Sequence, residues 1–239
     1  MDNLTQRLAQ VRERITAAEQ RYGRKPGSVH LLAVSKTRPA QDIEAALRAG
    51  QQCFGESYVQ EALTKMELLR GRPIQWHFIG PIQSNKTKSI AAGFDWVHSL
   101  DREGIAKRLS EQRPPAMGPL NVCLQVNISG EASKSGVQPE EVPALAHRIM
   151  VLPRLAVRGL MCIPAPDPDI ERQRLAFRRL HRIFKDLIER GLPLDTLSMG
   201  MSDDLEAAIA EGSTLVRVGS AIFGQRARRS GLSLTTRIL

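Results

Sequence analysis

Short apolar runs alternate with amphipathic helical stretches along nearly the whole chain. Residues 3–21 open the pattern with one apolar helical face, at Leu4, Leu8, Val11, Ile15 and Ala18. Eight apolar runs typical of strands follow, at 30–35, 52–57, 75–80, 96–100, 121–128, 157–163, 196–200 and 215–223. Helical patterns lie between them, for example at 40–49, 58–69, 102–112, 139–152, 170–190 and 203–210. The pattern predicts one helix followed by eight βα units.

The strands of such units are expected to be parallel, because a helix must return the chain from the end of one strand to the start of the next. Eight units close naturally into a (β/α)8 barrel of the TIM type, which typically needs ~250 residues. An open doubly wound sheet is the alternative, but no Gly-x-Gly-x-x-Gly follows the first strand-like run. We expect an α/β fold with one domain over residues 1–239, an added N-terminal helix at about 3–21 and a short basic tail at about 225–239.

The net charge of +9, from 34 Lys and Arg against 25 Asp and Glu, raises the question of nucleic-acid binding. The basic residues are dispersed, however, and their densest groups lie on the helical pattern at 171–182 and in the tail at 226–229. The few aromatic residues do not alternate with basic ones, as a base-stacking surface would require. We expect a solvated basic surface and no specific nucleic-acid partner, with weak polyanion binding left open.

The cysteines bear on the cellular compartment. Cys53, Cys123 and Cys162 stand far apart in apolar runs without CxxC spacing, which favours reduced thiols over a disulfide framework or a zinc site. No apolar run is long enough to span a bilayer, and the N-terminus lacks the apolar core of a signal peptide. We predict a cytoplasmic protein with no membrane partner and no metal site.

A single lysine, Lys36, ends the first strand-like run. In barrels of this kind the chemistry gathers at the C-terminal ends of the strands. An ammonium is costly to hold in such a place, and desolvation favours the neutral amine, which can attack a carbonyl carbon and form a Schiff base. The alternative interpretation is a lysine whose ammonium simply reaches solvent.

The segments Ser198-Met-Gly-Met-Ser202 and Val216-Arg-Val-Gly-Ser220 have features that suit a phosphate. Phosphates in barrels often bind after strands seven and eight, and strand eight lies beside strand one when the barrel closes. Gly200 leaves room for an anion to approach the backbone, and Asp203-x-x-Glu206 predicts a capping box behind Met201 and Ser202. Gly219 and Ser220 are expected in the last third of strand eight. An ordinary strand–turn–helix with close packing at Gly219 is the alternative.

Arg217 is expected to point into the barrel. Val216 and Val218 share the helix-facing side of the strand, so the alternation of side chains leaves Arg217 on the other face. A buried guanidinium cannot lose its proton and needs an acceptor. That acceptor is either Glu56, in a structural ion pair, or a bound cofactor.

Other polar residues give weaker predictions. His77 lies in an apolar strand and is expected to be a hydrogen-bonded core histidine, not a catalytic one. Asn85 and Lys86 either line the mouth of the barrel or start a helix after Ser84. Lys134 either attracts a second phosphate ligand or is an exposed loop lysine.

Six stretches in order along the chain resemble the YggS/PROSC family of pyridoxal 5′-phosphate (PLP) homeostasis proteins: LLAVSKT, FGESYVQEA, WHFIGPIQSNK, VNISGEASKSG, RGLMCIP and LSMGMSDDLEAAIAEGSTLVRVGSAIFG. The resemblance implies a barrel like the N-terminal domain of alanine racemase. It implies a Schiff base between PLP and Lys36, and a PLP phosphate held by Met201, Ser202, Gly219 and Ser220. Arg217 would lie at the cofactor ring, near the pyridine nitrogen. One departure is Ser57, where the family pattern has Asn; a serine can still cap a helix.

The resemblance implies a protein that holds PLP for buffering or for transfer to apo PLP-dependent enzymes. Because the sequence offers no second base and no domain to seal the site, we expect this cytoplasmic protein to be a monomer without robust turnover and with no catalytic residue. A PLP-dependent amino-acid racemase or decarboxylase is the alternative, and a cofactor-free Schiff-base aldolase is a third class. An aldolase needs a general acid or base at the strand ends, and the sequence singles none out. A racemase of this fold uses a second base from an additional domain, for which the residues after 224 are too few.

Overall fold

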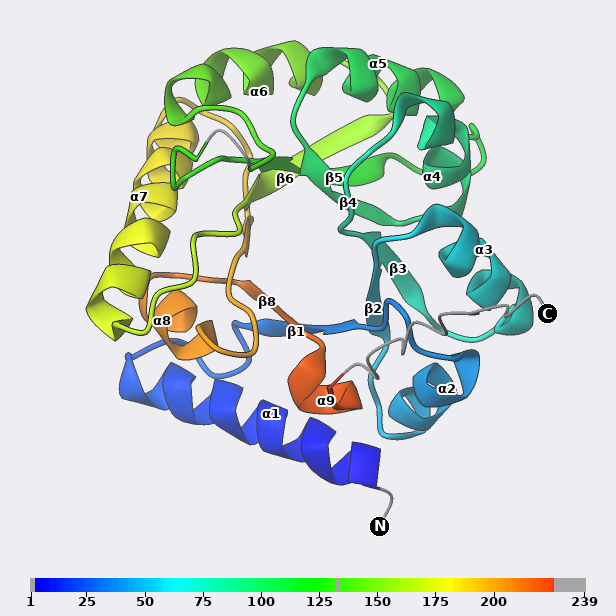
Figure 1. The fold of residues 1–239 in the computed structure, drawn as a ribbon. Coiled ribbons are helices and arrows are strands. Elements are labelled where there is room, and N and C mark those ends of the chain that lie inside the picture. Colours follow the sequence, from blue (N-terminus) through cyan, green and yellow to red (C-terminus); the bar gives the residue numbers. More distant parts are fainter. Residues whose placement is uncertain (1–2, 132–133, 226–239) are drawn as a thin grey trace, which may run out of the picture.

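The computed structural model describes residues 3–131 and 134–225, in which eight parallel strands close into a barrel (Figure 1). The strands are β1 (His30–Val34), β2 (Cys53–Glu56), β3 (Gln75–Phe78), β4 (Trp96–Leu100), β5 (Leu120–Gln125), β6 (Leu155–Met161), β7 (Thr196–Ser198) and β8 (Leu215–Val218). Each strand pairs with the next, and β8 closes the circle on β1, from His30 opposite Leu215 to Ala33 opposite Val218. The expected (β/α)8 barrel is confirmed, whereas the tail at 226–239 lies outside the described residues.

Helices surround the barrel (Figure 1). They are α1 (Asn3–Arg21), α2 (Ala40–Arg48), α3 (Val59–Leu68), α4 (Thr87–Gly93), α5 (Glu103–Gln112), α6 (Val142–Met150), α7 (Ile170–Glu189), α8 (Leu205–Ala210) and α9 (Ser220–Phe223), with 3-10 turns η1 (Ser84–Lys86) and η2 (Pro139–Glu141). The main core includes strand residues such as Phe54, Phe78 and Val97 and the apolar faces of the helices. Phe78 meets Phe94 edge to face, with ring centroids 5.2 Å apart. Burying each such side chain contributes roughly 1.5–3 kcal/mol, which is why the apolar periodicity predicts the fold well.

Helix α1 is the added N-terminal helix that the sequence predicts, and it buries the expected apolar face. It packs against α8 and α9 beside the β1–β8 seam (Figure 1). Two arginines of α1 fix this packing. Arg14 Nε donates to Glu206 Oε1 at 2.8 Å, and Arg7 Nε donates to the carbonyl oxygen of Ile222 at 2.6 Å.

Strand β8 is shorter than expected, because the chain leaves the sheet at Gly219 and forms the one-turn helix α9. The prediction of Gly219 and Ser220 inside strand eight was therefore wrong. In a strand, the neighbours Ile222 and Phe223 would point to opposite faces, whereas here both are buried beneath α1. Gly224, with φ +81°, ends the helix in a conformation that favours glycine.

Helix α8 starts later than expected, at Leu205, and the predicted capping box is absent. Asp204 occupies the N-cap position without bonding to the helix, because its Oδ1 accepts from the backbone N–H of Met201 at 2.5 Å. Glu206 instead pairs with Arg14 of α1. Helix α4 was not among the predicted ranges, although a helix start after Ser84 was one of the two alternatives there.

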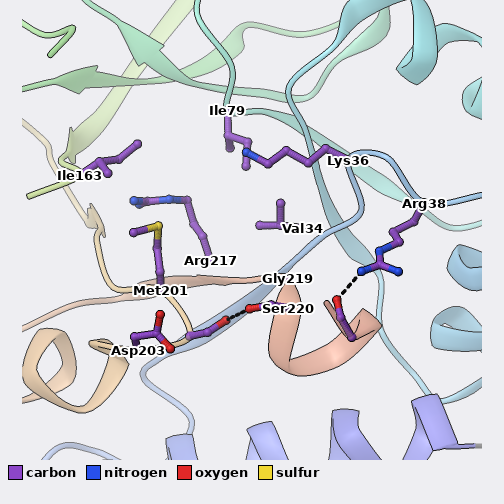
Figure 2. A pocket seen from close by; sticks show the side chains of 12 residues that line it. Val34, Lys36, Arg38, Ile79, Ile163, Met201, Asp203, Arg217, Gly219 and Ser220 are labelled. Atoms are coloured by element: carbon purple, nitrogen blue, oxygen red, sulfur yellow. Dashed lines mark hydrogen bonds between the residues drawn. The ribbon is translucent and has the colours of Figure 1, made fainter. Parts of the chain in front are cut away.

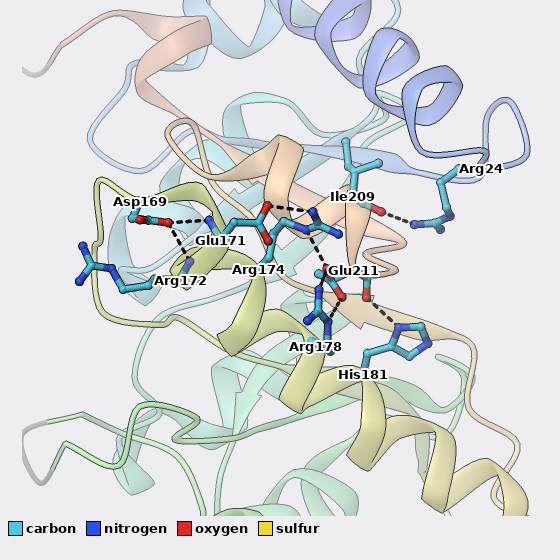
Figure 3. A network of polar contacts seen from close by, with 9 residues as sticks. All are labelled: Arg24, Asp169, Glu171, Arg172, Arg174, Arg178, His181, Ile209 and Glu211. Atoms are coloured by element: carbon cyan, nitrogen blue, oxygen red, sulfur yellow. Dashed lines mark hydrogen bonds and ion pairs between the residues drawn. The ribbon is translucent and has the colours of Figure 1, made fainter.

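The basic cluster of α7 takes part in a network of ion pairs with the end of α8 (Figure 3). Glu211 is 8% exposed and accepts from Arg174 and Arg178, while its carbonyl oxygen bonds to His181 Nδ1 at 2.7 Å. Burial alone would raise the pKa of Glu211, but the hydrogen bonds from the two arginines hold it below its usual value. Part of the basic cluster that suggested polyanion binding is thus paired within the fold.

The barrel interior is partly polar. It holds a small cluster of Trp96, Cys123 and Met161, separate from the main core, together with buried histidine, serine and arginine side chains. All three cysteines are free thiols, and burial raises the pKa of Cys123 and Cys162 to about 12. Within residues 3–131 and 134–225 there is no His, Cys, Asp and Glu group suited to a metal ion. No described helix is long and apolar enough to cross a membrane.

Candidate functional site

A cavity of about 340 Å³ opens at the C-terminal ends of the strands (Figure 2). All six residues that the resemblance singles out line it: Lys36, Met201, Ser202, Arg217, Gly219 and Ser220. They come from the ends of β1, β7 and β8, which barrel closure brings together. Sequence analysis missed the other lining residues: Val34, Arg38, Ile79, Ile163, Asp203 and Gly224. The guanidinium of Arg38 donates to the carbonyl oxygen of Gly224, which ties the turn after β1 to the end of α9.

Lys36 follows β1 in a tight turn, and its side chain extends across the cavity mouth toward Ile79 (Figure 2). The next residue, Thr37, has φ +65° and is the one non-glycine residue with positive φ among those described. This conformation is strained for a β-branched residue and persists only where surrounding contacts enforce it. The enforcing contact is Glu61 of α3, whose Oε1 accepts the Thr37 N–H at 2.5 Å.

Lys65 of α3 connects the contacts around this turn. Its Nζ donates to the carbonyl oxygen of Ser35 at 2.8 Å, to Glu56 Oε1 at 2.7 Å and to Glu61 Oε1 at 2.5 Å. Its side chain is 5% exposed, so all three donors of the ammonium are satisfied inside the protein. The backbone on both sides of Lys36 is thereby held through α3.

Glu56 does not pair with Arg217, so the expected structural ion pair is wrong, and it does not face water either. It is fully buried, bonds to Lys65 and to the Ser35 hydroxyl, and has no contact with solvent. Burial raises the pKa of its carboxyl, and the positive charge of Lys65 offsets only part of that rise. The sequence contained a signal that Lys65 is buried and needs a partner such as Glu56. Lys65 lies on the same helical face as the buried residues Val59 and Ala62.

Arg217 points into the barrel, as the strand alternation predicts, and is 4% exposed. Its Nη1 donates to the carbonyl oxygen and the hydroxyl of Ser198 at 2.6 and 2.8 Å, and its Nη2 donates to the carbonyl oxygen of Cys162 at 2.9 Å. No carboxylate of the described residues forms an ion pair with it, and its Nε–H and second Nη2–H have no acceptor there. The Asp204 carboxylate acts on Arg217 electrostatically but makes no ion pair with it. A buried guanidinium with uncommitted N–H groups, on the wall of a cavity, is suited to an anionic or electron-rich ligand atom.

The ends of β7 and β8 meet at two hydroxyls, where Ser220 Oγ donates to Ser202 Oγ at 3.1 Å (Figure 2). The Met201 N–H already donates to Asp204, so Met201 contributes its side chain to the wall next to Arg217 (Figure 2). The backbone N–H of Ser202 has no acceptor among the described residues and is available to a ligand.

Two glycines allow the backbone to approach closely here. Gly200 has φ +97°, and a Cβ there would lie 2.6 Å from the Ala208 side chain, so the turn after β7 requires glycine. A Cβ on Gly219 would lie 3.2 Å from the Val34 carbonyl oxygen, which agrees with the close-packing alternative at that position.

The remaining candidates lie outside this cavity. Lys134 Nζ is 3.6 Å from Glu131 Oε1 and its side chain is 24% exposed, so the expectation of a freely exposed lysine was wrong. Asn85 and Lys86 lie in η1, which leads into α4. The cap of α3 is Tyr58, without a side-chain bond, so Ser57 does not cap that helix.

His77 is a buried, hydrogen-bonded core histidine, as expected. Burial lowers its pKa to about 3, so the imidazole is neutral at physiological pH.

Known proteins resemble the chain over most of its length. The model of the alanine racemase N-terminal domain family matches residues 6–227. The pyridoxal phosphate homeostasis protein of Pseudomonas aeruginosa is 58% identical over 226 residues, which cover 95% of this chain and 97% of that protein. The protein of the same name from Escherichia coli K12 is 52% identical over 229 residues, which cover 95% and 98%.

Solved structures agree with these sequence matches. PipY of Synechococcus elongatus with PLP bound has a TM-score of 0.80 and 34% identity, covering 93% of this chain and 100% of that one. Alanine racemase of Corynebacterium glutamicum has a TM-score of 0.66 at 19% identity, covering 93% of this chain and 62% of that one. At that identity the likeness shows the fold alone.

Proposed function

Because the chain belongs to the alanine racemase N-terminal domain family and, within it, to the pyridoxal phosphate homeostasis proteins, we propose that it binds PLP in the cavity at the ends of β1, β7 and β8. Its role is to hold PLP reversibly, for buffering or for transfer to apo PLP-dependent enzymes, without robust turnover. The observation that carries the proposal is that one cavity is lined both by the primary amine of Lys36 and by the buried guanidinium of Arg217, which has no ion-pair partner among the described residues.

The residues of the cavity fit the groups of PLP. Its aldehyde carbon can form a C=N bond with a primary amine while one water molecule leaves, which is the chemistry that the bound group supplies. Lys36 provides that amine. The free N–H of Ser202 and the hydroxyls of Ser202 and Ser220 suit the phosphate, and the uncommitted N–H groups of Arg217 suit the pyridine nitrogen. The net charge of +9 favours the approach of an anionic ligand.

A carrier is favoured over a racemase or decarboxylase by what the cavity wall offers. Among its described lining residues the titratable groups are Lys36, Arg38, Asp203 and Arg217. Amino-acid chemistry needs acid and base groups on both faces of the reacting carbon, whereas Asp203, the one carboxylate among these described lining residues, is exposed to solvent. Against a decarboxylase in particular, the cofactor ring would face a guanidinium, not a carboxylate that keeps the pyridine nitrogen protonated. We further propose a monomer in the cytoplasm, where the three free thiols stay reduced.

The decisive experiment is the visible absorption spectrum of the purified protein with PLP, before and after borohydride reduction. Reduction should fix the phosphopyridoxyl label on the Lys36 peptide, and Lys36→Ala should lose both the absorption band and the label. Lys86→Ala is the matched control, because Lys86 lies outside the cavity. A label mainly on Lys86 or Lys134, with the band intact in Lys36→Ala, would refute the assignment.

A second experiment tests the carrier role itself. PLP-loaded protein is mixed with an apo-enzyme trap, and in parallel with a set of amino acids whose racemisation and decarboxylation are followed. Transfer without turnover is expected. Brisk turnover of any amino acid that depends on Lys36, or an obligate dimer that shares residues across its cavities, would overturn the proposal.

A further inference from the structure

Five polar side chains form a continuous hydrogen-bonded chain through the interior of the barrel. From the cavity inward, Arg217 Nη1 bonds to Ser198 Oγ at 2.8 Å, and Ser198 Oγ bonds to His98 Nδ1 at 2.7 Å. His98 Nε2 then bonds to His77 Nδ1 at 2.9 Å, and His77 Nε2 bonds to Gln75 Oε1 at 3.0 Å. The chain passes from β8 and β7 to β4 and β3, although β7 and β4 do not pair with each other.

The two ends of this chain differ in what they can do. Arg217 can only donate, because a guanidinium has no acceptor. The oxygen of Gln75, at the other end, can only accept, and it also accepts from the Cys53 thiol at 3.4 Å. The four members from Arg217 to His77 are each at most 4% exposed, so water offers no substitute partners.

These ends set one direction for every proton in between. Ser198 accepts from Arg217 and donates its hydroxyl proton to His98 Nδ1. His98 then carries its proton on Nε2 and donates to His77 Nδ1, and His77 carries its proton on Nε2 and donates to Gln75. The opposite order would leave the buried Ser198 hydroxyl proton without an acceptor and would set an imidazole lone pair against the Gln75 oxygen, which costs free energy at both places.

We propose that Ser198, His98 and His77 are positioning residues for Arg217, and that their one-way hydrogen-bond chain holds its guanidinium at the cavity wall for the ligand group it meets. The identity of the ligand rests on the proposed function, whereas the hydrogen-bond chain of side chains does not depend on it. Arg217 is anchored on one side only, by Ser198 and by the Cys162 carbonyl oxygen, while its Nε–H faces no described acceptor. The Ser198 hydroxyl is oriented to receive Arg217 because His98 takes its proton, and His98 is oriented in turn by His77.

The first test reads the protonation sites directly, in the protein without PLP. Two-bond ¹H–¹⁵N spectra of the histidine side chains at pH 7 distinguish a ring protonated on Nε2 from one protonated on Nδ1. Both His77 and His98 are expected to be neutral with the proton on Nε2. A proton on Nδ1 of either ring would contradict the proposed direction of the hydrogen bonds and refute the inference.

The second test measures the dissociation constant of PLP in a double-mutant cycle. Ser198→Ala should raise it by about 5- to 10-fold, the loss expected for one ordinary hydrogen bond, because Arg217 keeps its bond to the carbonyl oxygen of residue 198. Ser198→Thr, which keeps a hydroxyl, should stay within about 2-fold of the wild type. In an Arg217→Gln background the same Ser198→Ala change should have no further effect, because the chain acts through Arg217. Full additivity of the two losses would refute the positioning role.

The matched control is Ser213→Ala. Ser213 is also fully buried and bonds to backbone oxygens at the ends of β7 and β8, including Met199 at 2.7 Å, but it forms no hydrogen bond with Arg217. Its removal should leave the dissociation constant of PLP unchanged. Equal losses of PLP affinity in Ser213→Ala and Ser198→Ala would show that Ser198 acts only through packing in the core, and would refute the inference. If the wild type binds no PLP while both rings carry their protons on Nε2, the proposed function is wrong, but the hydrogen-bond chain to Arg217 is still supported.

Discussion

Acidification should destabilise the fold through the two buried imidazoles of the barrel interior. In the folded protein, burial lowers the pKa of His77 to about 3 and that of His98 well below its usual value, with the charges of His77 and Arg217 adding to the effect at His98. In the unfolded chain a histidine has a pKa of about 6.5. Between these limits the unfolded state binds more protons than the folded state, so the free energy of unfolding falls as the pH falls.

The size of the effect follows from the linkage relation. At pH 5 an unfolded histidine is almost fully protonated, whereas a ring with a folded pKa near 3 is almost fully neutral. His77, with its folded pKa of about 3, therefore costs about 2 kcal/mol of stability between pH 7.5 and pH 5, and His98 adds a further loss of the same sign. This is a large share of the ~5–15 kcal/mol that stabilises a typical domain. Below pH 5 the loss continues until the pH reaches the folded pKa of each ring.

Urea unfolding at a series of pH values from 7.5 to 4.5 measures this loss. His98→Gln is less stable throughout, but its stability should depend less on pH, with a slope near pH 5 that is smaller by up to about 1.4 kcal/mol per pH unit, the limit for one proton. His147→Gln is the control, because His147 lies on the exposed face of α6 and bonds only to the Pro143 carbonyl oxygen. Equal slopes in the wild type and His98→Gln would show that the buried ring is charged in the folded state and would refute the reasoning.

Four further predictions concern the site and the α7–α8 network. Arg217→Gln should weaken PLP binding by about 2–5 kcal/mol, because it removes a buried charge that faces the ligand, and equal affinities by fluorescence titration would contradict this. Ser202→Ala should cost at most about 1 kcal/mol in the same titration, since the backbone N–H remains; a larger loss would mean that the hydroxyl dominates. Thr37→Gly should raise the free energy of urea unfolding by about 0.5–1 kcal/mol, because relief of the positive φ exceeds the added entropy of the unfolded chain, and a loss would show that the Thr37 side chain stabilises the turn. Glu211→Gln should lower stability at pH 7 by about 1–3 kcal/mol, and the gap should narrow below about pH 4.5, because a carboxyl with a lowered folded pKa loses its contribution as it is protonated; a gap that is constant with pH would contradict the pairing.

Much of the candidate site follows from periodicity once the barrel is assumed. The alternation Val216, Arg217, Val218 sets the face of the arginine, and the order of the strands brings Lys36 next to it, because β1 and β8 must pair when the sheet closes. The end of β8 was mispredicted because Ser-Ala-Ile-Phe has no strong local preference for strand or helix. Contact with α1, more than 200 positions away in sequence, selects the helix.

The sequence by itself determined the barrel, since eight apolar runs joined by amphipathic helices can bury their faces together in few other ways. It also indicated that Lys36 and the Met201–Ser202 turn follow strand ends, although not where β8 ends. Only the tertiary structure decided what these residues bond to. The pairing of Glu56 with Lys65, and the link from Ser198 to His98, which lie 100 positions apart, depend on the register and closure of the sheet. Local sequence patterns predict which face of a strand or helix a side chain lies on. Its bonding partner across the barrel depends on the register and closure of the sheet, which no local stretch of the sequence specifies.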